Sequence, residues 1–272
     1  GSYDLAVLAM QEPQYANHSI ATLLAVLAEA EVPCLSLMNM PPLPFLKRIP
    51  AIDIGRVEAA YASPWVWQRF NPGLVSHCSP DPQAMRPPGQ KANVLLVGLA
   101  TNFKAAAFGS EKANVLLSEL SESIDDVRVI GQEVPVKLRR HGSIFAPFAK
   151  WSMLMAGNYR CVTTDAPISI HDAVCQMPDL AREVYEVTGE IVLRLGATRD
   201  DLVPFEKYAK AALCLNKPSS VARAINEGAP VVERVDRLIQ GLGRQVGLTH
   251  GQIDRIVDLV DHRIAGNSAK AA

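Results

Sequence analysis

The sequence has no long apolar run and almost no excess of charge of either sign, and each absence excludes a class of protein. Among its 272 residues, 27 Lys and Arg balance 28 Asp and Glu, so the formal charge is −1. Nucleic-acid binding needs a basic surface, and disorder needs few apolar residues, whereas 49% of this chain is hydrophobic. We therefore expect a globular protein of one large or two ordinary domains that does not bind nucleic acid.

Membrane and secretion signals are also missing. A spanning helix needs about 20 apolar residues, but the apolar stretch 92–103 is too short and prolines interrupt the stretch 32–46. The opening residues Gly-Ser-Tyr-Asp lack the basic and apolar regions of a secretory signal. We expect a soluble, cytoplasmic protein without a membrane partner.

Metal, disulfide and phosphate-loop motifs are absent from the sequence as well. The five cysteines form no C-x-x-C pair, and the six histidines form neither H-x-H nor H-E-x-x-H, so no metal site and no disulfide framework is predicted. No P-loop, G-x-S-x-G or G-x-G-x-x-G is present. The one G-x-G, at Gly241 and Gly243, falls inside a predicted helix with no strand before it.

What the sequence does contain at its start is one βαβ unit. The apolar segments 3–10 and 33–38 are typical of strands buried on both faces. Between them, apolar residues recur at helical spacing over 20–27, after Asn17 or Ser19 as the cap. Two parallel strands cannot form a sheet core alone, so further strands must complete the sheet.

Ligands of parallel sheets bind beyond the carboxyl ends of the strands, so residues 10–12 and 39–40 are expected to face the site. Residues 40–90 are rich in proline and predict irregular structure with a short strand at 73–77. More strands are expected at 93–99 and 127–130, with a helix over 110–121 between them.

The second half of the chain predicts consecutive helices. The segment 180–195 has the clearest helical period. Pro230 suits a first helical position, Thr249 and Gln252 form a capping box, and the tail 266–272 is expected to fray. The expected helices are 145–159, 180–195, 202–215, 219–226, 230–246 and 249–264.

Four places, taken in order, resemble the ketopantoate reductase family, also called 2-dehydropantoate 2-reductases. They are LAMQEPQ (8–14), LMNMPP (37–42), FAKWSMLMAGN (148–158), and KPSSVARAI (217–225) with VVERVD (231–236). The resemblance covers almost the whole chain and implies an α/β plus all-α fold. It implies a partial Rossmann-like NADP-binding domain over 1–142 and, over 143–272, a helical substrate and dimerisation domain of the 6-phosphogluconate dehydrogenase C-terminal-like type.

The dinucleotide domain of that family begins with G-x-G-x-x-G, which this sequence lacks. The resemblance therefore implies a fragment without the first two βαβ units, about 70 to 80 residues. It also implies the activity: NADPH-dependent reduction of a 2-oxo acid to a 2-hydroxy acid, as in the conversion of 2-dehydropantoate to pantoate in pantothenate biosynthesis. The helical half is a candidate for a homodimer interface.

Lys150 is the residue expected to carry the chemistry. Hydride transfer to the carbonyl carbon leaves an alkoxide, which needs a proton donor, and an ammonium group also stabilises the developing charge. The family places its catalytic lysine at this helix start. The alternative is an exposed lysine that extends from an amphipathic helix and has no catalytic role.

Asn158 follows Lys150 by eight residues, about 80° around an α-helix, so both can share one broad face. The family binds its substrate with asparagines four and eight residues after the lysine, and with a third soon afterwards. Here the first position is Leu154 and the third is Ile168. Fewer amides favour a larger or more apolar substrate than ketopantoate. The alternative for Asn158 is a helix C-cap after Gly157.

The resemblance assigns roles to four further residues. Ser220 matches a serine that binds the substrate carboxylate, and Glu233 matches a glutamate on the cofactor side. Asn39 matches an asparagine near both nicotinamide and substrate, and Gln11 stands at the cofactor side where many members carry a lysine. Structural alternatives remain for two of these positions, because Ser219 or Ser220 can cap a short helix and Glu233 can pair with Arg237.

Two other functions stay open. The missing glycine loop, together with Leu154, Ile168 and Gln11, is compatible with a reductase-like protein that binds a partner without catalysis. The same helical domain also occurs in opine-type and other 2-hydroxy-acid dehydrogenases, which would keep the chemistry and change the substrate.

Overall fold

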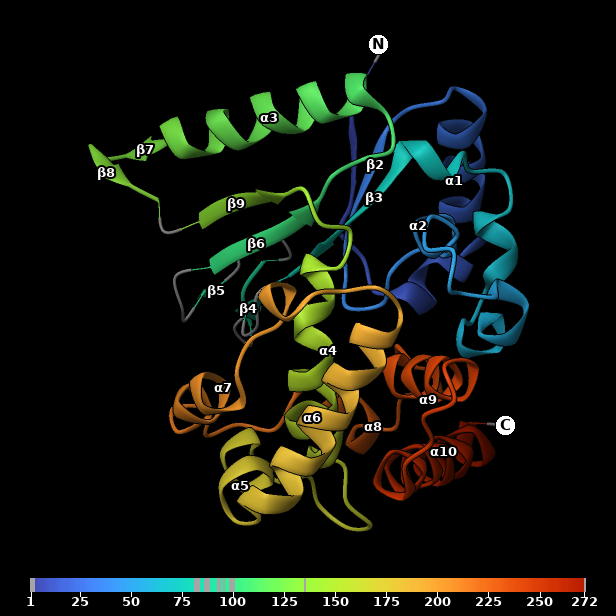
Figure 1. Ribbon diagram of the computed structural model, residues 1–272, viewed down its shortest axis with the longest axis vertical. Coiled ribbons are helices and arrows are strands. Elements are labelled where there is room, and N and C mark those ends of the chain that lie inside the picture. Colours follow the sequence, from blue (N-terminus) through green and yellow to red (C-terminus); the bar gives the residue numbers. More distant parts are fainter. Residues whose placement is uncertain are drawn as a thin grey trace.

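An α/β half is followed along the chain by a helical half (Figure 1). The computed structural model describes residues 3–80, 84–85, 89–91, 94, 96–97, 101–134 and 136–271. The strands are β1 (Ala6–Leu8), β2 (Cys34–Leu37), β3 (Val75–Ser79), β4 (Ala84–Met85), β5 (Leu96–Val97), β6 (Thr101–Ala106), β7 (Arg128–Val129), β8 (Gln132–Glu133) and β9 (Val136–His141). The α-helices are α1 (His18–Glu29), α2 (Leu43–Leu46), α3 (Glu111–Asp126), α4 (Ala149–Met153), α5 (Ile170–Cys175), α6 (Pro178–Arg194), α7 (Phe205–Ala212), α8 (Ser220–Asn226), α9 (Val235–Gln245) and α10 (Gly251–Ala271).

The α/β half is built on a five-stranded mixed sheet with the order β1-β2-β3-β6-β9. The strands β1, β2 and β3 run parallel, which confirms the predicted βαβ unit, and Asn17 caps α1 by accepting a hydrogen bond from the Ser19 N–H. The strand β6 is antiparallel to β3, and β9 pairs in parallel with β6 at the edge. Apolar side chains pack α1 against one face of the sheet and α3 against the other.

The second half of the sheet differs from the sequence-based prediction. The sequence does not predict β6 and β9, because lysine, arginine and asparagine side chains interrupt their apolar pattern. The predicted strand 93–99 lies mostly outside the described residues, and its described part, β5, pairs with β4. The predicted strand 127–130 is shortened to β7, which pairs with β8 in a hairpin and takes no part in the main sheet.

The helices follow the predicted positions but differ at their ends. The helix α9 begins at Val235 and not at Pro230, because the Val235 N–H donates to the Tyr159 hydroxyl. The helix α10 begins at Gly251, where the Gln252 N–H donates to His250 Nδ1, so Thr249 lies outside the helix. The expectation of a frayed tail is wrong: α10 continues to Ala271, and the Asn267 amide donates to the carbonyls of Ile225 and Ala229. The short helix α5 was not predicted.

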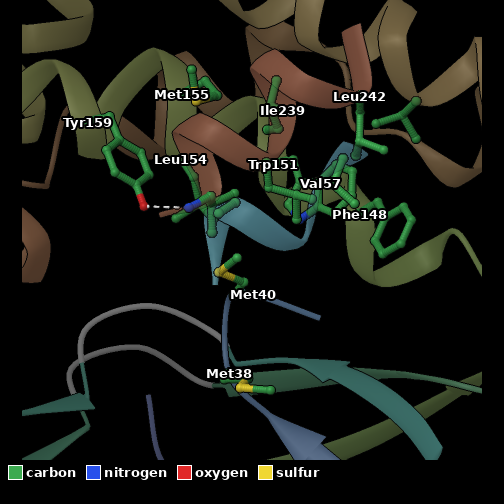
Figure 2. Packing of buried hydrophobic residues seen from close by; sticks show 14 of the residues in the cluster. Met38, Met40, Val57, Phe148, Trp151, Leu154, Met155, Tyr159, Ile239 and Leu242 are labelled. Atoms are coloured by element: carbon green, nitrogen blue, oxygen red, sulfur yellow. Dashed lines mark hydrogen bonds between the residues drawn. The ribbon is translucent and has the colours of Figure 1, made fainter. Parts of the chain in front are cut away.

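The predicted helix 145–159 is divided into several helical types. A 3-10 turn (Ala146–Phe148) leads into α4, the π-helix η7 (Leu154–Asn158) follows directly, and a second 3-10 turn (Tyr159–Cys161) ends the segment. Figure 2 shows its side chains Trp151, Leu154 and Met155 packed beside Ile239 and Leu242 of α9.

The core between the two halves continues from the sheet into the helices. In Figure 2, Met38 and Met40, which follow β2, lead from the strands toward Leu154 and Trp151.

In α9, a Cβ atom built on Gly243 would lie 2.5 Å from the Leu248 carbonyl oxygen. This glycine of the lone G-x-G is therefore required for close packing within the helical half.

Membrane-spanning helices, metal-binding clusters and disulfides are absent from the described part of the chain. No helix there is long and apolar enough to cross a membrane. No group of three or more His, Cys, Asp or Glu side chains in those residues is placed to hold a metal ion. The cysteines are free thiols, of which Cys34, Cys78 and Cys161 are buried.

Candidate active site

A small cavity lies between the α/β half and the helical half. Five of the predicted site residues line it, namely Gln11, Asn39, Asn158, Ser220 and Glu233. The rest of its wall consists of Leu154, Tyr159, Val221, Ala224, Val232 and Val235. Its volume of about 30 Å³ has room for one or two water molecules.

The two loops that follow β1 and β2 meet at the carboxylate of Glu233. The Asn39 amide donates to Glu233 Oε2 at 3.1 Å, and the Glu12 N–H donates to Oε1 at 3.3 Å. Burial raises the pKa of Glu233, while these two hydrogen bonds and the charge of Lys150 act in the opposite direction. Glu233 therefore joins the helical half to both strand ends, and the alternative pairing with Arg237 does not form, because Arg237 binds Asp261.

Glu12 is a second buried carboxylate at this junction, and sequence reasoning missed its role. Its side chain is 1% exposed and accepts hydrogen bonds from the N–H groups of Ala62 and Ser63. Burial raises its pKa, and these backbone bonds partly lower it. Glu12 thus fixes the loop 61–63 beside the cavity. Its position after β1 was the available signal, but its partners lie 50 residues away in a proline-rich segment.

Asn39 presents an acceptor at the same place. Its amide nitrogen is used by Glu233, and its Oδ1 atom is buried without a hydrogen-bond partner among the described residues. A buried carbonyl oxygen without a partner costs free energy unless a ligand or water supplies a donor. The Oδ1 atom of Asn39 is therefore an acceptor that a water molecule or a ligand would satisfy.

Lys150 lies on α4, one helical turn before Leu154, and does not itself line the cavity. It is half-buried, and its Nζ donates to the carbonyl of Pro80, just after β3. Its charge lowers the pKa of both His77 and Glu233. This environment differs from that of a lysine extended into solvent.

Asn158 and Ser220 are placed on the cavity wall, and neither acts as the helix cap that the sequence allowed. Asn158 keeps helical dihedral angles at the end of η7. Ser219, the neighbour of Ser220, caps α8 by accepting from the Ala222 N–H, and its hydroxyl donates to the Asn158 carbonyl at 2.6 Å. Ser220 is therefore left to face the cavity. Ile168 does not line the cavity and packs against the core.

Tyr159 fixes the wall opposite the strand ends. Its hydroxyl donates to the Glu233 carbonyl at 2.6 Å and accepts from the Val235 N–H at 3.0 Å, the bond drawn in Figure 2. Burial keeps its pKa well above the ordinary value, so the hydroxyl stays neutral and can donate. This role could not be predicted from the sequence, because tyrosine is common at the apolar positions of a helix.

Comparison with known proteins gives no match in sequence and clear matches in structure. No protein-family model and no curated protein matches the sequence. A D-mandelate dehydrogenase solved with NADH and anilino(oxo)acetate has a TM-score of 0.64 and 14% identity, over 98% of this chain and 78% of its own. A ketopantoate reductase from Ralstonia eutropha JMP134 gives 0.63 and 16%, over 98% and 78%.

A dimeric ketopantoate reductase from Staphylococcus aureus gives a TM-score of 0.61 and 13% identity, over 97% of this chain and 78% of its own. At sequence identities this low, the structural agreement establishes the fold alone. The agreement extends over nearly the whole chain and therefore includes both halves. The predicted fold class is confirmed: the chain has the fold that ketopantoate reductases share with D-mandelate dehydrogenase.

Proposed function

We propose that this protein is an oxidoreductase that reduces a 2-oxo acid to a 2-hydroxy acid with a nicotinamide dinucleotide, NADPH being the expected form. The observation that carries the proposal is the single cavity at which Gln11 and Asn39 of the α/β half meet Asn158, Ser220 and Glu233 of the helical half. The shared fold with a dehydrogenase solved with NADH and anilino(oxo)acetate supports the same class of chemistry.

In this proposal, Lys150 is the general acid. Reduction adds hydride to the carbonyl carbon and a proton to the carbonyl oxygen, and the Lys150 ammonium donates that proton before it is protonated again from solvent. Asn158 and Ser220 orient the substrate by hydrogen bonds. The Pro80 carbonyl that accepts from Lys150 holds the ammonium group at the edge of the sheet until a substrate oxygen replaces it.

The described residues fit the nicotinamide end of a dinucleotide, which supplies the hydride when bound. The Oδ1 atom of Asn39 can accept from a carboxamide N–H, and Glu233 holds the Asn39 side chain in place. Gln11 adds a second amide at the end of β1. We therefore assign residues 1–142 to a dinucleotide-binding domain. We assign only part of such a domain to them, because no glycine-rich phosphate loop occurs in the described residues.

The free edge of the sheet supports this assignment. In the described sheet, β1 pairs only with β2, and large apolar side chains of β1 and of the helix α1 that follows it are exposed, with Val7 at 50%, Leu23 at 58% and Val26 at 55%. Such side chains are typical of an interior strand and its helix. We infer that further strands, with the phosphate loop, pair with β1. Residues 143–272 then form the substrate domain.

The apolar wall of the cavity favours a substrate with an apolar side chain. Leu154, at a position where the resembled family carries an asparagine, and Val221 both face the cavity, and the lining contains no Lys or Arg. A dehydrogenase of another 2-hydroxy acid is therefore a second candidate, in which ketopantoate is not the preferred substrate.

We further propose that the protein is cytoplasmic and that it forms a homodimer. The homodimer is proposed because a dimeric reductase has this fold, and light scattering of the purified protein tests it.

The test uses the protein expressed from its natural start codon. Oxidation of NADPH and of NADH is followed with ketopantoate, 2-oxoisovalerate and phenylglyoxylate. We expect Lys150→Ala to lower kcat by about 100-fold or more with a small change in KM, whereas Lys112→Ala, at an exposed position of α3, leaves both unchanged.

Leu154→Asn should shift kcat/KM from phenylglyoxylate toward ketopantoate, because the amide adds a hydrogen bond for the hydroxyl group of ketopantoate. The absence of turnover with every acid would overturn the proposed function. Normal turnover in Lys150→Ala would leave the reaction but refute the role of Lys150.

A further inference from the structure

The helix that carries Lys150 changes its type between Lys150 and Asn158. The α-helical part ends at Met153, and Leu154–Asn158 form the π-helix η7. Single π turns are rare and occur often at functional sites. A side chain or water that inserts into the hydrogen-bond ladder is one known cause of a distorted helix. A local cause should therefore be found beside η7.

Tyr208 of α7 provides that cause. In a regular α-helix the Met153 carbonyl accepts only from the Gly157 N–H, but here the Tyr208 hydroxyl donates to it at 3.2 Å. A Cβ atom on Gly157 would lie 1.9 Å from the Tyr208 hydroxyl oxygen and 3.2 Å from Cγ2 of Ile170. The hydroxyl thus occupies the space that a side chain at position 157 would need. Burial raises the pKa of Tyr208, so the hydroxyl remains protonated and can donate.

Other side chains bind the carbonyls that follow, so the altered turn is stabilised along its length. The Cys161 thiol donates to the Gly157 carbonyl at 3.3 Å, and the Ser219 hydroxyl donates to the Asn158 carbonyl at 2.6 Å. Arg160 donates to the Ala156 carbonyl at 3.3 Å. These bonds satisfy acceptors that would otherwise be buried without partners at the end of the helix.

The change of helix type moves Asn158 relative to Lys150. Eight residues of α-helix would leave Asn158 about 80° away from Lys150 around the axis. A π turn contains more residues than an α turn, so each residue of η7 advances less around the axis, and Asn158 rotates back toward the face of Lys150. Leu154 and Asn158, on successive turns, both line the cavity.

We propose that Tyr208 is a positioning residue: its hydroxyl, inserted over Gly157, holds the π turn that places Asn158 in the cavity wall and rotates it toward the face of Lys150. This inference rests on the proposed function only for its kinetic consequence. The geometry of η7 is a property of the folded chain, and it can be tested without a substrate.

Tyr185 supplies a matched control for Tyr208. The two rings stack at 5.4 Å in the same cluster, and the Tyr185 hydroxyl also donates to a backbone carbonyl, that of Val203, at 2.7 Å. Tyr185→Phe and Tyr208→Phe each remove one such hydroxyl, but of the two hydroxyls only that of Tyr208 donates to a carbonyl of the Lys150 helix. A role in folding alone predicts similar effects of both substitutions.

The first experiment is kinetic. We expect Tyr208→Phe to lower kcat/KM for the best 2-oxo acid by about 5- to 100-fold, the effect of one lost substrate hydrogen bond, with Tyr185→Phe close to wild type. Because Tyr208 acts through Asn158, Tyr208→Phe should add little to Asn158→Ala in a double-mutant cycle. Additive effects, or equal effects of the two tyrosine substitutions, would overturn the proposal.

The second experiment separates this proposal from the proposed function. In a crystal structure of Tyr208→Phe, we expect residues 154–158 to return to α-helical hydrogen bonding and the Asn158 side chain to leave the cavity wall. An unchanged π turn with Asn158 at the cavity would refute the role of Tyr208, whatever the enzyme assay shows. A protein without 2-oxo acid reductase activity would overturn the proposed function and leave this structural result to decide the role of Tyr208.

Discussion

His77 is a fully buried histidine whose titration should control the stability of the protein in acid. It lies in β3 opposite Ser36 of β2, and its Nδ1 is 2.9 Å from the Ser36 hydroxyl. Its Nε2 is buried without a hydrogen-bond partner in the described residues. Burial, and then the charge of Lys150, lower the pKa of His77 to about 3. The imidazole is therefore neutral in the folded protein at neutral pH.

The sign of the effect follows from the two pKa values. The pKa of an unfolded histidine is about 6.5, so between about pH 6.5 and 3 the unfolded chain binds a proton that the folded chain does not. The free energy of unfolding contributed by His77 is complete above pH 6.5 and is lost as the pH falls toward 3. From pH 7.5 to 5.0 the loss is about 2 kcal/mol, a large part of a typical total of 5 to 15 kcal/mol.

Urea unfolding at pH 7.5 and 5.0, followed by tryptophan fluorescence, measures this loss. His77→Phe should be about 2 kcal/mol less sensitive to pH than wild type, while carboxylates elsewhere contribute equally to both and cancel in the difference. At pH 7.5, His77→Phe leaves the Ser36 hydroxyl without a partner, which costs about 1 to 3 kcal/mol. The double substitution Ser36→Ala with His77→Phe should recover most of that cost. Equal pH sensitivity of all three proteins would refute the reasoning.

Two further predictions concern packing in the helical half. Asp236 is fully buried and paired with Arg234, which also binds Asp261. Asp236→Asn should therefore lower the free energy of unfolding, measured in urea, by about 3 to 5 kcal/mol. Replacement of the whole pair, by Arg234→Met with Asp236→Leu, should lower it much less, and an equal loss would contradict this explanation. Gly243→Ala should lower the thermal midpoint, because the added Cβ would lie 2.5 Å from the Leu248 carbonyl oxygen and 3.0 Å from Ile191. Gly266→Ala in α10, where a Cβ meets nothing within 4 Å, should raise the midpoint slightly, and a fall there would point to another cause.

The positions of Gln11 and Asn39 could be predicted from the sequence because the rule behind them is local. A buried strand, a helix and a second buried strand fix a parallel pair, and the residues that follow both strands must then lie at one edge of the sheet. The structure places both side chains at the cavity. The strands β6 and β9 could not be predicted from a local pattern. Polar residues interrupt their apolar sequence, and their pairing with each other is seen only in the folded sheet.

The contacts of Glu233 could not be predicted in this way. Its partners Asn39 and Glu12 lie 194 and 221 residues earlier in the chain. The sequence offered a local pairing with Arg237 instead, and in the folded protein Arg237 is held by Asp261. A buried carboxylate without hydrogen bonds would cost free energy. The contact between the two halves offsets this cost for Glu233, because it brings two donors from separate loops to the carboxylate.

The sequence by itself determined the βαβ unit and the helical second half, because strand and helix periods depend on neighbours only a few residues apart. The tertiary structure decided which polar residues share the cavity, that Ser219 and not Ser220 caps α8, and that the helix after Lys150 widens into a π turn. The last depends on one hydroxyl, that of Tyr208, placed over a glycine 51 residues away in the sequence. Hydrogen bonds and packing of this kind act between segments that only the completed fold brings together.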